Sequence, residues 1–500
     1  MRFGVLTGLY VGVVVMAQVG TNKIVDVPLT NAGRDYHVVC PARGGRWVVA
    51  LQRMLNPIPV AVLDLAARKP QWRPFVTDAQ GTVAGRVIGD RYVAVTDIGA
   101  PRGRVVGIPL DSSTPNDSAS WEEIVPESEA VIRSVWPVRD HLYVTEFVDT
   151  YARVRMFTVD GRLAGEVPLP GLGAIAELPF PLMNASAPTD ESCFLFGFSS
   201  LIASWGTYLH RPGANEIVTL VAPEVTLDEA VVEDHWAVSS DGTRIPYHVV
   251  RLRRATAELP RPTLMYAYGG FNAPWVPQFP GAMAAFVAAG GLFVHCHLRG
   301  GGEFGLDWWS GGRLKNKQNC YRDLYAIAED LIARGATRSD VLAVTGGSNG
   351  GLMAGVAAVQ RPDLWCAVVP RVPLMDLIGA CRDPYGRNAV SIDFGNPDDA
   401  DEVRRLAGFS PYQMIEDGKA YPAVYIDAGD TDPRCPPWHA RKFAARLQAA
   451  QAEDAPILVR IWSNVGHGWA TAKDVEIEEH TEWLAFVMQQ VGLTCGSMSQ

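Results

Sequence analysis

The sequence has no closely spaced cysteine pair, although it contains eight cysteines. None of them has the C-x-x-C spacing that zinc sites and redox pairs use. A chain of 500 residues does not need disulfides for stability, so we expect reduced, mostly buried thiols and a cytoplasmic protein. The cysteines are Cys40, Cys193, Cys296, Cys320, Cys366, Cys381, Cys435 and Cys495.

A basic surface is missing as well. The formal net charge is -10 and no basic stripe stands out, so we expect no nucleic-acid partner. The composition, with 48% apolar and 20% charged residues, is typical of a soluble globular protein, and we expect no membrane partner. A chain of 500 residues is too long for one ordinary core and predicts two domains.

The first half contains a repeat. Each repeat has an apolar run, a polar turn and a second, alternating run, which predicts a β-hairpin. The starts are 36, 45, 50 and 51 residues apart, a period typical of propeller blades, with a β-sandwich as the alternative. We therefore predict a β-propeller-like domain over residues 1–225, with about five blades visible. The repeats begin at Tyr10, Arg46, Arg91, His141 and Ser192.

The N-terminus allows two interpretations. Residues 1–17, "MRFGVLTGLYVGVVVMA", have one arginine and then an apolar run, as a signal peptide does. The same residues supply the first strand of the first repeat, "VGVVVMAQ", which the turn "GTNK" follows. We expect the segment to be folded and retained, with the signal peptide as the alternative.

The pattern changes after a linker-like passage at residues 221–250. Short apolar runs then alternate with helical segments; in one of these, Leu324, Ile327, Ala328 and Leu331 share a face. Buried strands joined by crossover helices predict a doubly wound parallel sheet. We assign residues 226–500 to an α/β-hydrolase domain. Its predicted strands lie at 263–270, 291–300, 341–347, 366–372, 423–429 and 457–464.

The stretch "VTGGSNGGLMAG" at residues 344–355 runs from a strand through a glycine turn into a helix. Within it, G-x-S-x-G places Ser348 on the strained turn that presents a nucleophile. Two alternatives fit less well. A Walker loop ends in G-K-[ST], and a dinucleotide loop has a different glycine spacing and an acidic residue after the next strand. We predict that Ser348 is a nucleophile.

A nucleophilic serine of this kind needs a downstream acid and base, in the order Ser, Asp, His. His467 lies between two glycines at a strand exit, and an incidental surface residue is the alternative. Three aspartates are candidates for the acid, and the local pattern leaves the choice open. Asp427 lies inside a strand, whereas Asp430 and Asp432 lie in the loop that follows.

Other histidines have simpler explanations. His439 fits the helix that follows Pro436 and Pro437, and His295 and His297 fall in a strand run that faces a core or an interface.

Seven motifs follow one another through the second half: "YAYGGFN" (266–272), "HLRGGGEFG" (297–305), "NKQNCYRDL" (316–324), "GGSNGGL" (346–352), "QRPDLW" (360–365), "DTDPRCPP" (430–437) and "GHG" (466–468). Together they resemble the prolyl oligopeptidase family of serine peptidases, and they occur in family order. That family also has an N-terminal β-propeller, so the resemblance covers most of the chain.

The resemblance implies roles for particular residues. The D-x-R pattern of the family matches Asp432 and Arg434. This match selects Asp432 over Asp430 as the acid. It also implies that Arg434 binds a backbone carbonyl of the substrate. The oxyanion hole would comprise the backbone N–H of Asn349 and the hydroxyl of Tyr268. The implied substrate is a short peptide, and no metal or cofactor is implied.

The chain departs from the family pattern in its β domain. Only about five repeats are visible, and we expect no counterpart of the family's extra N-terminal segment. In the family, the propeller restricts access to small peptides. A smaller or open ring therefore puts that size filter in doubt.

The residues of this chain that match the family's proline pocket also depart from the family pattern. Val390 stands where a tryptophan stacks on the proline ring, and Cys435 replaces an aliphatic residue. Phe271, Val372 and Phe394 match other pocket positions. Losing one aromatic wall removes about 1 kcal/mol of stacking, so we expect an apolar pocket in which the proline preference stays open.

Three functions are compatible with these motifs. The first is a serine peptidase that hydrolyses short peptides through an acyl-enzyme, with cleavage after proline as the implied preference. The second is an esterase, an amidase or a peptide ligase that uses the same machinery, because fold and site chemistry are shared. The third is a non-catalytic binding protein, which would need a broken triad or oxyanion hole. The oligomeric state is not predicted.

Overall fold

The computed structural model describes residues 15–17, 24–26, 37–41, 45–53, 55–177, 192–253, 260–468 and 471–494. The chain divides into two compact units. The first unit comprises Met1–Phe198, Trp205–Ala222 and Phe304–Leu306, and the second comprises Ser199–Ser204, Pro223–Glu303 and Asp307–Gln500.

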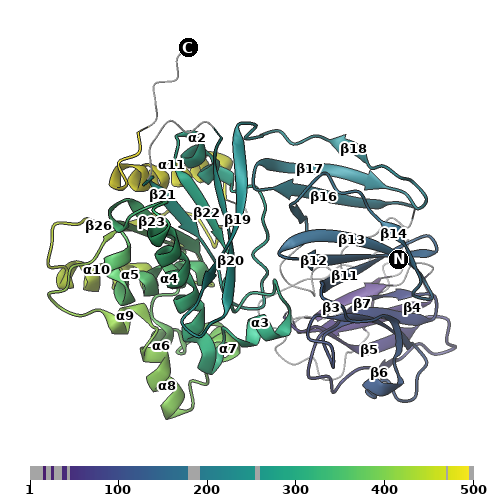
Figure 1. Cartoon of the computed structure of the whole chain (residues 1–500). Coiled ribbons are helices and arrows are strands. Elements are labelled where there is room, and N and C mark those ends of the chain that lie inside the picture. The colour runs from purple at the N-terminus through teal and green to yellow at the C-terminus, as the bar shows by residue number, and fades with distance from the viewer. Residues whose placement is uncertain are drawn as a thin grey trace. The chain divides into compact units, whose positions relative to one another are not determined.

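The first unit consists of antiparallel sheets built from consecutive strands (Figure 1). Four sheets have four strands each, and the predicted hairpins form the two central strands of each. The propeller-like repeat is therefore confirmed in these four sheets. Their strands are β3 (His37–Pro41), β4 (Trp47–Gln52), β5 (Ile58–Asp64) and β6 (Trp72–Pro74); β7 (Val83–Ile88), β8 (Arg91–Thr96), β9 (Arg104–Pro109) and β10 (Glu122–Val125); β11 (Val131–Val138), β12 (His141–Val148), β13 (Tyr151–Thr158) and β14 (Leu163–Glu166); and β15 (Ala174–Ile175), β16 (Phe194–Ser200), β17 (Ala203–His210) and β18 (Val218–Val221).

A fifth, two-stranded sheet corresponds to the first repeat. Strand β1 (Val15–Ala17) pairs antiparallel with β2 (Ile24–Asp26), so these residues form a hairpin as predicted. Residues 1–14 and 18–23, which include the predicted turn, lie outside the described residues. The choice between a signal peptide and a retained N-terminus falls on those residues.

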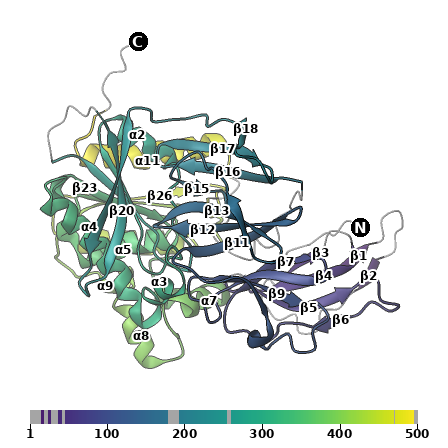
Figure 2. The same ribbon diagram turned by 45° about the vertical axis from the view of Figure 1, so that its right-hand side comes forward.

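Consecutive sheets of the first unit pack through their apolar faces (Figure 2). Side chains alternate between the two faces of a strand, so one strand can serve two interfaces. In β8, Tyr92 joins the apolar cluster shared with the preceding sheet, and Val93 joins the cluster shared with the following one. Further along, the ring of Tyr143 in β12 stacks on Phe194 of β16, with 4.9 Å between centroids. Each sheet is therefore held mainly by its neighbours in the chain.

The second unit is built on one eight-stranded sheet, in the order β19-β20-β22-β21-β23-β24-β25-β26. The six strands from β22 to β26 in this order run parallel, which confirms the predicted hydrolase sheet. The linker interpretation of residues 221–250 is wrong, because β19 and most of β20 lie there and pair antiparallel. The strands are β19 (Ala230–Val238), β20 (Arg244–Leu252), β21 (Thr263–Tyr266), β22 (Leu292–Cys296), β23 (Leu342–Gly347), β24 (Ala367–Arg371), β25 (Ala423–Gly429) and β26 (Ile457–Trp462).

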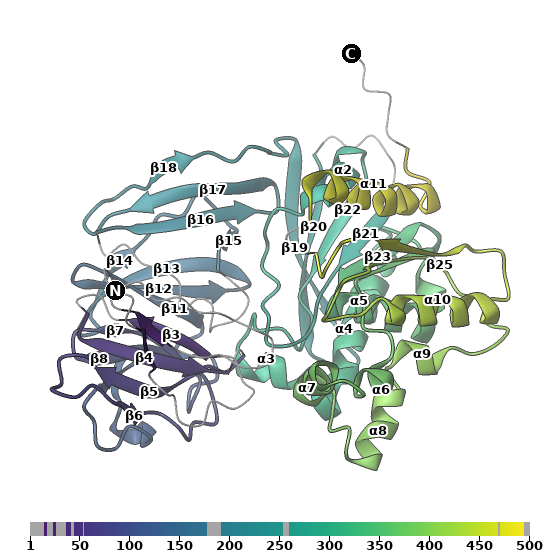
Figure 3. The ribbon, with the colours of Figure 1, turned by 180° about the vertical axis from the view of Figure 1, so that it is seen from behind.

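Helices cover both faces of this sheet (Figure 3). In β23, Leu342 and Val344 face the cluster that α4, α5 and α10 cover, whereas Ala343 faces the cluster under α2 and α11. The helices are α2 (Ala284–Ala288), α3 (Leu306–Ser310), α4 (Lys317–Ala333), α5 (Asn349–Gln360), α6 (Leu377–Ala380), α7 (Pro384–Asp393), α8 (Ala400–Ala407), α9 (Pro411–Met414), α10 (Trp438–Ala450) and α11 (Lys473–Gln490).

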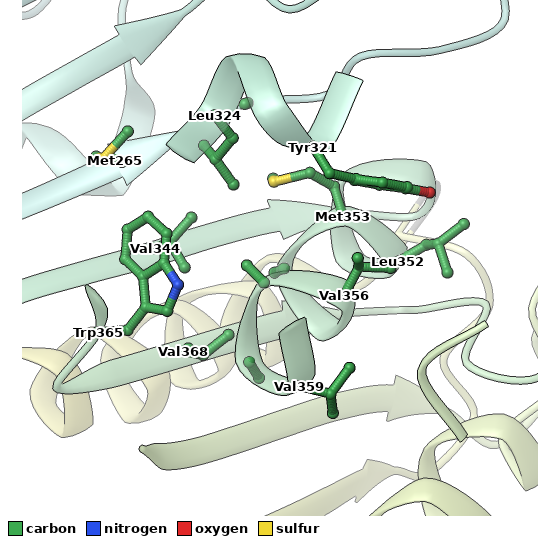
Figure 4. Close-up of a cluster of buried hydrophobic side chains, with 14 of the residues drawn as sticks. Met265, Tyr321, Leu324, Val344, Leu352, Met353, Val356, Val359, Trp365 and Val368 are labelled. Atoms are coloured by element: carbon green, nitrogen blue, oxygen red, sulfur yellow. The ribbon is translucent and has the colours of Figure 1, made fainter. Parts of the chain in front are cut away.

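Helix α5 lies in the middle of the larger cluster. Figure 4 shows its side chains Leu352, Met353 and Val356 between α4 and the strands β23 and β24. Eleven of its twelve residues are buried. The four residues of α4 that were predicted to share one face are all buried too. The start of α5 is thus fixed from several sides, and this is where Ser348 lies.

A buried arginine ties three elements of the second unit together. Arg299 donates to Asp323 of α4 through Nη2 at 2.6 Å, and to Asp241 of the β19–β20 turn through Nη1 at 2.6 Å. Its side chain is 7% exposed and that of Asp323 is fully buried. The end of β22 is therefore joined to α4 and to the antiparallel edge of the sheet.

Seven of the eight cysteines fall within the described residues, and none of these seven is in a disulfide. Over the same part of the chain, no helix combines the length and apolar character needed to cross a membrane.

We expect Arg299→Met to lower the free energy of unfolding by about 3–5 kcal/mol, because it leaves a buried carboxylate without its partner. Calorimetric unfolding would measure the change. The exposed pair between Arg338 and Asp340 supplies the control: Arg338→Met should leave the free energy of unfolding nearly unchanged. Equal losses in the two variants would contradict the structural role of Arg299.

Candidate active site

Ser348 occupies the sharp turn between β23 and α5. Its backbone has φ 58° and ψ −116°, a conformation that is strained for any residue other than glycine. The Ser348 N–H donates to the carbonyl of Arg371 at 2.9 Å, and the Leu352 N–H donates to the carbonyl of Ser348 at 3.0 Å. The turn is thus held by β24 on one side and by the first turn of α5 on the other.

Packing requires some of the glycines around Ser348 and not others. A Cβ on Gly346 would lie 2.5 Å from the carbonyl oxygen of Gly350, and one on Gly350 would lie 2.6 Å from that of Ala267. A Cβ on Gly347 would meet nothing within 4 Å. Close backbone approach therefore requires Gly346 and Gly350, but not Gly347.

His467 lies between Ser348 and Asp432. Its Nε2 is 2.9 Å from the Ser348 hydroxyl oxygen, and its Nδ1 is 2.6 Å from Asp432 Oδ2. The other carboxylate oxygen of Asp432 accepts the backbone N–H groups of Arg434 and Cys435, at 2.8 and 3.0 Å. The carboxylate, which is fully buried, is thus surrounded by three donors and held in one orientation.

The other two candidate aspartates have different partners. Asp427 is buried in β25, where it pairs with Arg371 at 3.2 Å. Asp430 accepts the backbone N–H of Asn464 at 2.8 Å. Of the three aspartates, Asp432 is the one whose carboxylate contacts His467.

The loops that carry Asp432 and His467 are joined directly. Thr431 donates to the carbonyl of Val465 through its N–H at 3.1 Å and through its hydroxyl at 2.9 Å. The same carbonyl lies so close to Gly429 that a side chain there would have no room. These contacts hold the two loops at a fixed spacing.

The other histidines that the sequence set aside lie elsewhere. His439 is buried at the start of α10 and accepts the backbone N–H of Asp376 at 3.2 Å. His295 in β22 and His297 just after it are also buried.

Tyr268 and Asn349 are in direct contact. The Asn349 side-chain amide donates to the carbonyl of Tyr268 at 2.6 Å, which ties the loop after β21 to the start of α5. The Tyr268 ring stacks on Trp275, with 5.3 Å between centroids. Burial raises the pKa of the Tyr268 phenol well above its ordinary value, so the hydroxyl stays protonated and can donate. The backbone N–H of Asn349 lies in the first turn of α5, where amides lack intrahelical partners.

The five residues expected to line the specificity pocket differ in their burial and in their contacts. Val390, Phe394 and Cys435 belong to the buried core cluster, and Phe271 packs against it, with its ring 5.8 Å edge-on from that of Phe394. Val372 is half-buried and is joined to Asp427 instead, through its backbone N–H at 2.9 Å. Four of the five therefore share one apolar cluster, in which Val390, Phe394 and Cys435 are closed off from solvent.

Cys435 also lies beside Ser348. Burial raises the pKa of its thiol to about 12, and a hydrogen bond with Ser348 opposes part of that shift. The thiol is therefore protonated at neutral pH. Next to it, Arg434 donates to the hydroxyl of Tyr385 through Nε at 2.8 Å.

Three features of the site have no clear signal in the sequence. The side chain of Asn349 anchors Tyr268, whereas the motif points only to the backbone of Asn349. Trp275 supports the Tyr268 ring, and Tyr385 contacts Arg434. Trp275 lies in a loop and Tyr385 in the first turn of α7, and no periodicity predicts that either comes to the site.

Within the described ranges, no group of three or more histidine, cysteine, aspartate or glutamate side chains is placed to hold a metal ion.

Two family models match the chain. The model of the prolyl oligopeptidase family matches residues 277–494, and that of the N-terminal β-propeller domain of prolyl oligopeptidase matches residues 42–217. The chain belongs to the prolyl oligopeptidase family.

Individual members of the family show the extent of the similarity. The chain is 29% identical to a prolyl endopeptidase of Elizabethkingia miricola over 458 residues, which cover 89% of this chain and 62% of that enzyme. It is 31% identical to a prolyl endopeptidase of Dictyostelium discoideum, with 75% of this chain and 50% of that enzyme covered. The chain thus spans less than two thirds of the length of these relatives.

Solved structures agree on the fold. One from a study of two prolyl endopeptidases superposes with a TM-score of 0.87 and 29% identity, covering 98% of this chain and 73% of the other. Prolyl oligopeptidase B from Galerina marginata, bound to a macrocyclization substrate, superposes with a TM-score of 0.86, covering 97% of this chain and 68% of the other. Its identity of 23% supports a shared fold and no more.

We expect Gly350→Ala to lower the free energy of unfolding by about 1–3 kcal/mol, because the new methyl group would press on the carbonyl of Ala267. Gly347→Ala is the matched control and should cost less than about 1 kcal/mol, because its side chain meets open space. Thermal unfolding of the two variants would compare them. A larger loss for Gly347→Ala would contradict the packing described for this turn.

Proposed function

We propose that the chain is a serine peptidase that hydrolyses short peptides through an acyl-enzyme. The observation that supports this best is the position of His467, whose two ring nitrogens lie 2.6 Å from Asp432 and 2.9 Å from Ser348. A base within hydrogen-bond reach of a hydroxyl, oriented by a third group, is the arrangement that activates a serine.

In the proposed first step, the Ser348 oxygen forms a bond to the acyl carbon of the substrate while His467 Nε2 takes the hydroxyl proton. The electron pair of the carbonyl moves onto its oxygen. Asp432 keeps the other ring nitrogen protonated and stabilises the imidazolium that forms. The Tyr268 hydroxyl and the Asn349 N–H donate to the oxyanion.

The tetrahedral intermediate then breaks the bond to the leaving amine, which takes the proton from His467. Water attacks the resulting acyl-enzyme with His467 again as the base. The acid product leaves and the Ser348 hydroxyl is restored. An amine in place of water would give peptide transfer, so hydrolysis and ligation differ only in this second half.

We further propose that the acyl-side residue is apolar, with proline as the expected preference. Phe271 and Phe394 would form its walls, and Arg434 would donate to a backbone carbonyl of the substrate. The names of the similar prolyl endopeptidases support this preference. Because Val390, Phe394 and Cys435 are closed off from solvent, substrate would enter beside Phe271 and would reach Phe394 only after displacing the side chains that cover it.

A panel of chromogenic aminoacyl amides and esters tests the reaction class. We expect amide cleavage, fastest with proline on the acyl side, and loss of activity by at least about a thousandfold in Ser348→Ala. Cleavage of esters alone would rule out a peptidase and favour an esterase. Full activity in Ser348→Ala would rule out this nucleophile, and equal rates for all acyl residues would rule out the proline preference.

Tyr268→Phe tests the oxyanion hole. Removing one donor should lower kcat about a hundred- to a thousandfold with little change in KM, since the hydroxyl acts on the charge that develops in the transition state. Steady-state kinetics on the best amide substrate would measure both constants. Tyr266→Phe, which alters a half-buried tyrosine two residues earlier in the chain, is the control and should leave kcat within about threefold. A loss confined to KM would mean that Tyr268 binds substrate instead.

A further inference from the structure

The motif "NKQNCYRDL" at residues 316–324 has no part in the proposed chemistry, yet it supplies a buried charge. Lys317 begins α4, and its Nζ lies 2.6 Å from Asp393 Oδ2 at the end of α7. The two side chains are 1% and 0% exposed. A buried ion pair is seldom more stable than a well-packed apolar pair, so this one calls for a reason other than stability.

Both members of the pair hold the loop that follows β21. Lys317 Nζ also donates to the carbonyl of Gly269 at 3.0 Å. Asp393 Oδ1 accepts the backbone N–H of Phe271 at 3.0 Å and the indole N–H of Trp309 at 3.1 Å. The pair thus satisfies a carbonyl and an amide of one short loop, on either side of Gly270.

The loop has little freedom between these contacts. A Cβ on Gly270 would lie 2.6 Å from the side-chain nitrogen of Asn349 and 3.0 Å from Asp393. Phe271 and Asn272 have positive φ values of 58° and 54°, which residues other than glycine adopt at a cost. A backbone of this kind keeps its conformation only while its surroundings hold it.

The pair also contacts the expected pocket. Lys317 Nζ lies over the ring of Phe394, 4.6 Å from its centroid, and Phe394 in turn contacts Phe271. The hydroxyl proposed to hold the oxyanion belongs to Tyr268, the residue directly before Gly269. One ion pair therefore reaches both the oxyanion loop and the apolar wall.

We propose that Lys317 and Asp393 are positioning residues, which set the Tyr268 hydroxyl and the Phe271 ring without touching substrate. This inference rests on the proposed function for its catalytic consequence. The structural part of the inference is that the ion pair fixes the position of Tyr268, and this part can be tested without measuring enzyme activity.

A double-mutant cycle separates positioning from a general structural role. We expect Asp393→Asn to lower kcat at least about tenfold with KM within about threefold, and to change kcat less than about threefold in the Tyr268→Phe background. Losses that multiply in the double variant would show that Asp393 does not act through Tyr268, and would overturn the inference.

A double variant without either charge supplies a second test of positioning against a general structural role. Lys317→Met/Asp393→Leu removes both charges, so it should regain thermal stability relative to Lys317→Met, which leaves a buried carboxylate unpaired. We expect kcat to stay low in the double variant, because Gly269 and Phe271 still lack their partners. Recovery of kcat together with stability would mean that the pair serves folding alone.

Fluorotyrosine labelling gives a readout that does not depend on activity. The ¹⁹F resonance of Tyr268, assigned by its loss in Tyr268→Phe, should shift or broaden in Asp393→Asn. Glu146→Gln is the matched control, because Glu146 is a fully buried carboxylate paired with Arg153 and Arg155 in the first unit. That variant should leave the resonance unchanged.

The two readouts separate the possible failures. An unchanged Tyr268 resonance in Asp393→Asn would overturn the positioning inference, whatever the activity. A wild-type chain that cleaves no amide or ester would overturn the proposed function, while a shifted resonance would still support positioning of Tyr268.

Discussion

The left-handed backbone of Ser348 is the constraint on which the rest of the site depends. A turn with φ 58° must be held on both sides, and the parallel sheet supplies both supports. Strand β24 accepts the Ser348 N–H, and the start of α5 packs against the carbonyl of Ala267 at the end of β21. Because Tyr268 directly follows Ala267, the contact that allows the strained turn also fixes the residue proposed to hold the oxyanion. The proposed nucleophile and one proposed oxyanion donor thus share a support.

The topology of the sheet explains why residues distant in sequence meet here. Tyr268, Ser348, Asp432 and His467 each follow a parallel strand, namely β21, β23, β25 and β26. The carboxyl ends of parallel strands lie at one edge of a sheet, so the loops after them gather there. Short contacts then set the spacing within the edge, as between Thr431 and Val465. The helices on both faces bury the strands, and this leaves the loops to carry the polar groups.

Much of this arrangement could be predicted from local sequence. The parallel strands are apolar runs, and glycines flank both Ser348 and His467. Three kinds of feature could not be predicted. The outer strands of the small sheets, such as β6 and β18, are short and partly exposed, so their patterns are weak. The edge strand β19 lacks an alternating pattern, because the polar run Glu233, Asp234 and His235 interrupts it, and it resembled a linker. The choice among three aspartates, and the roles of Asn349 and Trp275, depend on loop paths that only tertiary packing defines.

The pairwise packing of the small sheets has a consequence for the evolution of the first unit. Each apolar cluster there joins two successive sheets, so its stability is approximately a sum of nearest-neighbour terms. Gain or loss of one sheet would change the interfaces on its two sides and leave the other clusters intact. The eight-stranded sheet has no such freedom, since its central strands are shared by two helical layers. The length of the first unit can therefore change by a whole sheet while the remaining sheets keep their own interfaces.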